Sequence, residues 1–172
     1  MRAMLQLLNK FDQWLIKFVR PLLVVIGLFV PIVMVTGILM RSAFNAPLLG
    51  LEEIILFCVM WLYMLGAVLA SRDRSHLSAD FVSAFIHNVR IKNALQMTAK
   101  LVSMVAVVAF VVWSFDLLHW GLTMQQSTPV FRLPLYLSQA SVFVASLCFL
   151  LYQLRDLISD LVDHSEKSAE IG

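Results

Sequence analysis

The chain has 172 residues, of which 60% are hydrophobic and 14% are charged, and its mean hydropathy is +0.85. An ordinary soluble domain is about 45–50% apolar and about 25% charged, so this composition argues against a water-soluble globule. Thirteen Lys and Arg against eleven Asp and Glu give a formal net charge of +2, which is too small and too scattered for a nucleic-acid-binding face.

Residues 1–20 predict an amphipathic helix that lies flat on the membrane surface. Apolar side chains recur there at helical spacing, and polar side chains such as Lys10 and Lys17 fill the other face. The apolar stripe consists of Met4, Leu7, Leu8, Phe11, Trp14, Leu15 and Phe18. Packing of this stripe against the bundle or a partner is the alternative. The polar leader and the next apolar block are too long for a secretion signal, so we expect a membrane anchor.

Four apolar blocks predict an all-α integral membrane protein with a single membrane domain over 1–172. The blocks cover 21–40, 54–70, 101–115 and 135–152, and none contains Asp, Glu, Lys, Arg or His. Backbone groups in hydrocarbon must be paired within the segment, so the blocks predict helices rather than strands. With their flanks, the expected transmembrane helices cover about 21–40, 52–71, 98–118 and 134–154. Pro31 is expected to bend the first of them.

Residues 79–89 predict a second interfacial amphipathic helix between the second and third spans. Phe81, Val82, Phe85, Ile86 and Val89 form one stripe, and Asp80, Ser83, His87, Asn88 and Arg90 face away from it. Residues 155–172 are expected to form a cytoplasmic tail.

The distribution of cations predicts the topology, because Lys and Arg resist translocation across the membrane. Eleven of the thirteen fall in the N-terminal segment, the middle loop and the C-terminal tail, whereas the other two loops contain only Arg41 and Arg132. Both termini and the middle loop are therefore expected in the cytoplasm. The eleven are Arg2, Lys10, Lys17, Arg20, Arg72, Arg74, Arg90, Lys92, Lys100, Arg155 and Lys167.

Several functional classes are disfavoured by the sequence. A carrier that binds its own ion usually keeps an ionisable side chain at membrane depth, and the four apolar blocks have none. Of the four histidines, only His119 is expected at the outer side, so no pair of them could hold one haem iron. No catalytic or phosphate-binding motif is present. Cys58 and Cys148 both fall inside apolar blocks and are interpreted as packing residues.

The second span and the turn after it contain a distinctive series of residues. Glu52 and Glu53 open the span, where the helix N-terminus stabilises carboxylates, so simple capping is one interpretation. Trp61 lies at mid-membrane, and Gly66, Ala67 and Ala70 form a small-residue patch that lets a second backbone approach, in this chain or another. Arg72, Arg74, His76 and Asp80 follow, and a basic turn with local ion pairs is favoured over a metal site that would have only two ligands.

These residues resemble a known family. Glu52, Glu53, Trp61, the Leu65-Gly66-Ala67 patch, Arg72, His76 and Asp80 resemble the pattern of the small membrane subunit of tripartite ATP-independent periplasmic (TRAP) transporters. The segment Ser127-Thr128-Pro129, with Leu133-Pro134 and Tyr136, is similar to the segment before that family's last helix. The chain departs from the pattern at Ser138-Gln139-Ala140, where many members carry another proline.

The resemblance implies a non-catalytic accessory subunit in the bacterial inner membrane. In that family a large membrane subunit binds sodium and substrate and moves them, and a soluble periplasmic protein delivers an organic acid. The small subunit packs against the fixed part of the large one, so sodium is expected only in the large subunit and no cofactor is expected here. Membrane lipids would be the remaining partner.

The resemblance also suggests roles for particular residues. By analogy, Glu52, Glu53, Arg72, His76 and Asp80 would hold helix ends or subunit contacts. Trp61 and the Gly66–Ala67 patch would belong to an apolar contact face. Asn45 and Arg132 lie in the outer loops and are candidates for docking the periplasmic protein. The alternatives are a self-contained homo-oligomeric channel and, less favoured, a membrane enzyme.

Overall fold

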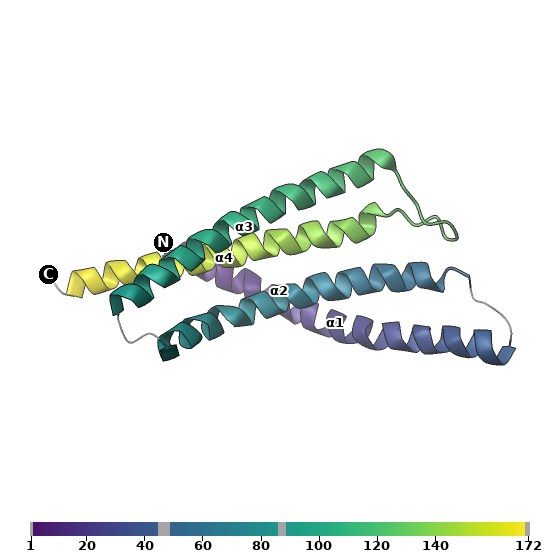
Figure 1. The fold of residues 1–172 in the computed structure, drawn as a ribbon, viewed down its shortest axis with the longest axis horizontal. Coiled ribbons are helices and arrows are strands. Elements are labelled where there is room, and N and C mark those ends of the chain that lie inside the picture. The colour runs from purple at the N-terminus through teal and green to yellow at the C-terminus, as the bar shows by residue number, and fades with distance from the viewer. Residues whose placement is uncertain (1, 45–48, 86–88, 171–172) are drawn as a thin grey trace.

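The computed structural model describes the backbone of residues 2–44, 49–85 and 89–170, and the side chains of 12–44, 49–72, 95 and 97–158. Within these ranges the chain forms four helices. They are α1 (Arg2–Phe44), α2 (Leu51–Phe85), α3 (Val89–Met124) and α4 (Tyr136–Glu170). The helices run alternately up and down, and both termini lie at the same end of the molecule (Figure 1).

Each helix contains a segment that is long and apolar enough to cross a membrane. The candidate spans are Asp12–Phe44, Leu51–Arg72, Met97–Met124 and Tyr136–Ile158. About 20 helical residues cross the roughly 30 Å of hydrocarbon, so every segment is sufficient. The prediction of an all-helical chain with four long apolar helices is therefore confirmed. The candidate spans are longer than the apolar blocks because each helix continues into its polar flanks.

The two expected interfacial helices are not separate elements in the described backbone. Residues 2–20 continue directly into the first span as part of α1, and residues 79–85 form the end of α2. Residues 86–88 lie outside the described backbone. The sequence contains no Gly or Pro at 2–20 or at 67–85 that would end a helix. Pro21 and Pro31 both lie inside α1, which continues past them, as membrane-spanning helices often do at proline.

The core of the bundle is built around α4, which packs against α2 and α3, while α1 packs mainly against α2. The buried residues of α4 are mostly small, and small residues allow neighbouring helices to approach closely. They are Ser138, Ser141, Ala145, Ser146, Cys148 and Tyr152. Val68 of α2 joins Ala145, Cys148 and Tyr152 in one cluster, and Leu15 of α1 packs against it.

The α4 helix runs without interruption from Tyr136, so the missing proline at Ser138-Gln139-Ala140 leaves a continuous helix. The outer faces of α1 and α3 are exposed and largely apolar, as a surface in contact with lipid or another protein would be.

Candidate functional site

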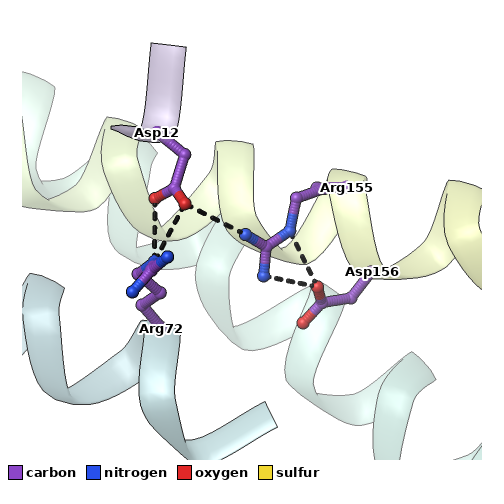
Figure 2. A network of polar contacts seen from close by, with 4 residues as sticks. All are labelled: Asp12, Arg72, Arg155 and Asp156. Atoms are coloured by element: carbon purple, nitrogen blue, oxygen red, sulfur yellow. Dashed lines mark hydrogen bonds and ion pairs between the residues drawn. The ribbon is translucent and has the colours of Figure 1, made fainter. Parts of the chain in front are cut away.

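A buried carboxylate joins three helices at the end of the bundle where both termini lie. Asp12 of α1 has a side chain that is only 7% exposed. The Nε of Arg72 on α2 donates to both of its oxygens, at 3.1 Å to Oδ1 and 2.9 Å to Oδ2. Arg155 of α4 approaches the same Oδ2 through Nη1 at 3.7 Å. Figure 2 shows the Arg72 guanidinium below this carboxylate and the Arg155 guanidinium to its right. Asp12 therefore connects α1 to α2 and α4 through charge.

Asp156 completes this group, which we call the Asp12 cluster and define as Asp12, Arg72, Arg155 and Asp156. The Nε and Nη2 of Arg155 donate to Oδ1 of Asp156 at 3.1 and 3.0 Å. The Arg155 guanidinium also lies over the Tyr152 ring, 5.3 Å from its centroid. Two cations and two anions balance within the cluster, so both arginines can be partly buried. Such a network fixes the relative positions of the helices that it joins.

Sequence periodicity did not identify Asp12. The predicted stripe places Trp14, Leu15 and Phe18 together on the side that faces lipid, and in the structure Trp14 and Phe18 are exposed whereas Leu15 packs against the core. The inward face instead follows Asp12, Leu15 and Val19, which are spaced three and four residues apart. One available signal was that Asp12 is the only acidic residue in the first 51, where a lone carboxylate lies among five cations.

A second polar site lies at the opposite end of the bundle, at the start of α2. Glu53 accepts hydrogen bonds from the backbone N–H groups of Val130 at 2.7 Å and Phe131 at 2.9 Å. These amides belong to the loop between α3 and α4. The Glu53 carboxylate therefore connects the α1–α2 pair of helices to the α3–α4 pair. Capping of α2, the simple interpretation, does not describe this longer-range role.

The loop fastened by Glu53 is a small hairpin over residues 126–135. Leu135 donates to the carbonyl of Gln126 and Thr128 donates to that of Leu133, both at 2.9 Å. The buried hydroxyl of Thr128 accepts from the Leu133 N–H at 2.9 Å. The hairpin is therefore held by its own bonds as well as by Glu53.

Gly50 allows the hairpin to approach α2 closely. Its φ is +93°, and a Cβ at this position would contact the Phe131 ring, with Cδ2 at 2.8 Å. Arg132 follows Phe131, is exposed, and has a φ of 52°. Arg132, the candidate residue for docking the periplasmic protein, therefore lies on a turn that Glu53 holds in place. Asn45, the other candidate, lies outside the described residues.

The remaining predicted residues do not gather into one site. Glu52 is exposed beside Glu53, and Trp61 is half-buried. A Cβ on Gly66 would meet nothing within 4 Å and Ala67 is exposed, so the small-residue patch faces outward. His76 and Asp80 belong to α2, but their side chains lie outside the described set. Of the series after the second span, the structure brings Arg72 to a partner on another helix.

The geometry can hold helices in place, and its ionic contacts are those of a structural network. Within the described residues no group of three or more His, Cys, Asp or Glu side chains could hold a metal ion. Four membrane-length helices, fastened by one ionic cluster at one end and one carboxylate at the other, define a polytopic helical membrane protein.

Comparison with known families is more specific. Residues 30–163 match the family model described as tripartite ATP-independent periplasmic transporters, DctQ component, and the chain belongs to this family. The chain is therefore a small, non-catalytic transmembrane subunit of a TRAP transporter. Membership implies a tripartite complex with the DctM component and a periplasmic binding protein. The comparison with curated proteins gave no match. Glu53, Arg72 and Arg155 fall inside the matched range, whereas Asp12 precedes it.

Proposed function

We propose that this chain is the scaffold subunit of a sodium-coupled importer of organic acids, in which it packs against and stabilises the static part of the large membrane subunit. The observation that carries the proposal is the family match in a chain whose four apolar blocks contain no ionisable side chain. The apolar blocks themselves therefore offer no ionisable side chain that could bind a travelling ion. Sodium and the acid would then be bound by other subunits.

The structure offers broad apolar surfaces for this role. The outer face of α1 is exposed along the span, and the Gly66–Ala67 patch on α2 has room for a close backbone approach. The Asp12 cluster and Glu53 hold the helices that carry these surfaces. A scaffold requires such fixed helix positions, because a contact surface that moved could not hold the static part of the large subunit in place.

We further propose that both termini and the segments around 1–20 and 79–89 lie at the cytoplasmic face of the bacterial inner membrane. The two termini share one end of the bundle, and most of the cations belong to the segments near that end. The hairpin with Arg132 would then face the periplasm, where the binding protein docks.

The proposal is tested by purification and transport assays. We expect the chain to copurify with the large membrane subunit in mild detergent. Proteoliposomes with all three components should take up the organic acid along a sodium gradient, and vesicles with this chain alone should not. Sodium-driven uptake by this chain alone would contradict the proposal. Single-channel currents from the isolated chain would instead favour the homo-oligomeric channel.

A further inference from the structure

One face of α3 points away from the rest of the chain and carries a carboxylate at its centre. Asp116 is exposed on this face, between Trp113, which is 71% exposed, and Trp120, which is 45% exposed. Ser114 and Gly121 are buried on the side of α3 that packs on α4. At 100° per residue they lie roughly 150° around the helix from Asp116.

Asp116 also lies well inside the candidate span. It precedes the span's last residue, Met124, by eight positions, which is about 12 Å along a helix. The apolar block 101–115 ends directly before it. Asp116 makes no hydrogen bond or ion pair with the part of the chain that the structure describes. Its charge is therefore not compensated from within these residues.

An uncompensated carboxylate distinguishes this face from an ordinary lipid-facing surface. The exposed face of α1, for example at Val25, Leu28 and Ile32, carries no charged side chain between Arg20 and Arg41, so its composition suits acyl chains and a protein partner alike. A carboxylate at membrane depth is costly and is usually paired with a cation. Two flanking tryptophans offer wide apolar contact and an N–H donor each, which is typical of the centre of a protein interface.

We propose that Trp113, Asp116 and Trp120 form a docking face for one transmembrane helix of the large membrane component, and that this helix presents a Lys or Arg side chain to Asp116. The inference rests on the proposed function, since it assumes that the large component is the partner. Beyond the proposed function, the inference names the face of the small subunit that makes the contact and the positive charge that the partner helix must carry.

The test measures association of the two full-length membrane subunits in mild detergent, with Asp116→Lys, Asp116→Asn and Asp116→Glu compared with the wild type. Asp116→Lys should weaken association by at least about tenfold, because it removes the Asp116 carboxylate and places a like charge against the proposed Lys or Arg of the large subunit. Asp116→Asn should weaken it less, and Asp116→Glu, which keeps the charge, should bind nearly as tightly as the wild type. Wild-type affinity in Asp116→Lys would overturn the inference.

A photo-crosslinking amino acid at position 120, with Asp116 intact, avoids any loss of folding in the charge variants. It should crosslink to the large subunit, whereas crosslinks to lipid alone would overturn the inference.

Native mass spectrometry tests whether the cation that pairs with Asp116 belongs to a lipid. Loss of bound phosphatidylethanolamine in Asp116→Asn with unchanged subunit association would assign Asp116 to a headgroup amine and overturn the inference. Failure of the wild-type subunits to associate would instead refute the proposed function itself.

Discussion

At the scale of single residues, two carboxylates organise this protein by forming contacts over long sequence separations. Asp12 and Arg72 are 60 positions apart, and Glu53 and Val130 are 77 apart. Each carboxylate lies near the end of a membrane-spanning segment and accepts hydrogen bonds that its charge strengthens. Asp12 thereby stabilises a contact between helices, and Glu53 stabilises a contact between α2 and the loop that precedes α4.

Replacing Asp12 by Asn should destabilise the bundle. The substitution removes the anion that both Arg72 and Arg155 approach, and breaking a partly buried ion pair of this kind costs about 1–3 kcal/mol. Thermal unfolding of the purified chain in detergent would measure the change. Asp156→Asn is the matched control, because Asp156 is more exposed and, among the side chains that the structure describes, bonds its neighbour Arg155. An equal loss in both variants would contradict a special role for Asp12.

Replacing Glu53 by Gln should loosen the hairpin over residues 126–135. The amide has a single acceptor oxygen and no charge, so it cannot accept strong bonds from Val130 and Phe131 at once. Hydrogen exchange measured by mass spectrometry should show several-fold faster exchange in the peptide that contains these two residues. The neighbouring Glu52→Gln, which alters an exposed side chain, should leave exchange unchanged. Equal protection in the wild type and Glu53→Gln would show that the hairpin holds itself.

At the scale of elements, the contact between α3 and α4 depends on small and hydroxyl-bearing residues. The hydroxyls of Ser114 and Ser146 lie 2.8 Å apart and are buried between the two helices. Near the hairpin end, Gly121 of α3 lies directly against the amide of Gln139 on α4. Hydrogen bonds and close backbone approach of this kind hold helices together where lipid offers no hydrophobic driving force.

Replacing Gly121 by Ala should displace the Gln139 side chain from its position against α3. A Cβ at this position would overlap the Gln139 amide, with Cδ at 2.8 Å, and because the amide ends a flexible side chain that can move aside, the cost should lie at the low end of the range of about 1–3 kcal/mol expected for overpacking. The double variant Gly121→Ala, Gln139→Ala removes the obstructing amide and should recover most of the loss, as measured by thermal unfolding. If the double variant were as unstable as the sum of the two single variants, the clash would not be the cause.

At the scale of the whole molecule, the up-and-down order of the helices places the two polar sites at opposite ends. The Asp12 cluster lies at the end that holds both termini, and the hairpin lies at the other end (Figure 1). With α4 at the centre, the outer faces of α1 and α3 remain uncovered by this chain. Polar contacts hold the helices together at both ends of the bundle, and the exposed faces of α1 and α3 are available for contact along its length. Such a subunit is suited to rigid attachment in a larger complex.

The proposed orientation predicts the behaviour of reporter fusions. Green fluorescent protein fused to either terminus should fluoresce, since that end is proposed to be cytoplasmic. Alkaline phosphatase inserted at position 132 should be active, because it matures only in the periplasm. Replacing Arg72 and Arg74 by neutral residues should weaken this bias, since cations set the orientation. Active phosphatase at the C-terminus would contradict the orientation.

The four spans could be predicted from sequence because their cause is local. Long apolar blocks must pair their own backbone groups in lipid, so hydropathy alone specifies helices and their approximate positions. The Glu52–Glu53 pair and Arg72 were also singled out, since charges at the ends of an apolar block stand out in composition. The two interfacial helices are not seen as separate elements in the described backbone, because amphipathic periodicity does not show whether a helix continues into its neighbour.

What the sequence determined by itself was therefore the membrane-spanning character, the helical class and, through local motifs, the resemblance to a family. The tertiary structure decided which polar groups meet: Arg72 with Asp12 rather than along its own turn, and Glu53 with the hairpin amides. Those pairings depend on which faces of distant helices pack together. Local periodicity does not encode that choice, because it is set by the fit of small residues on α4 against its neighbours.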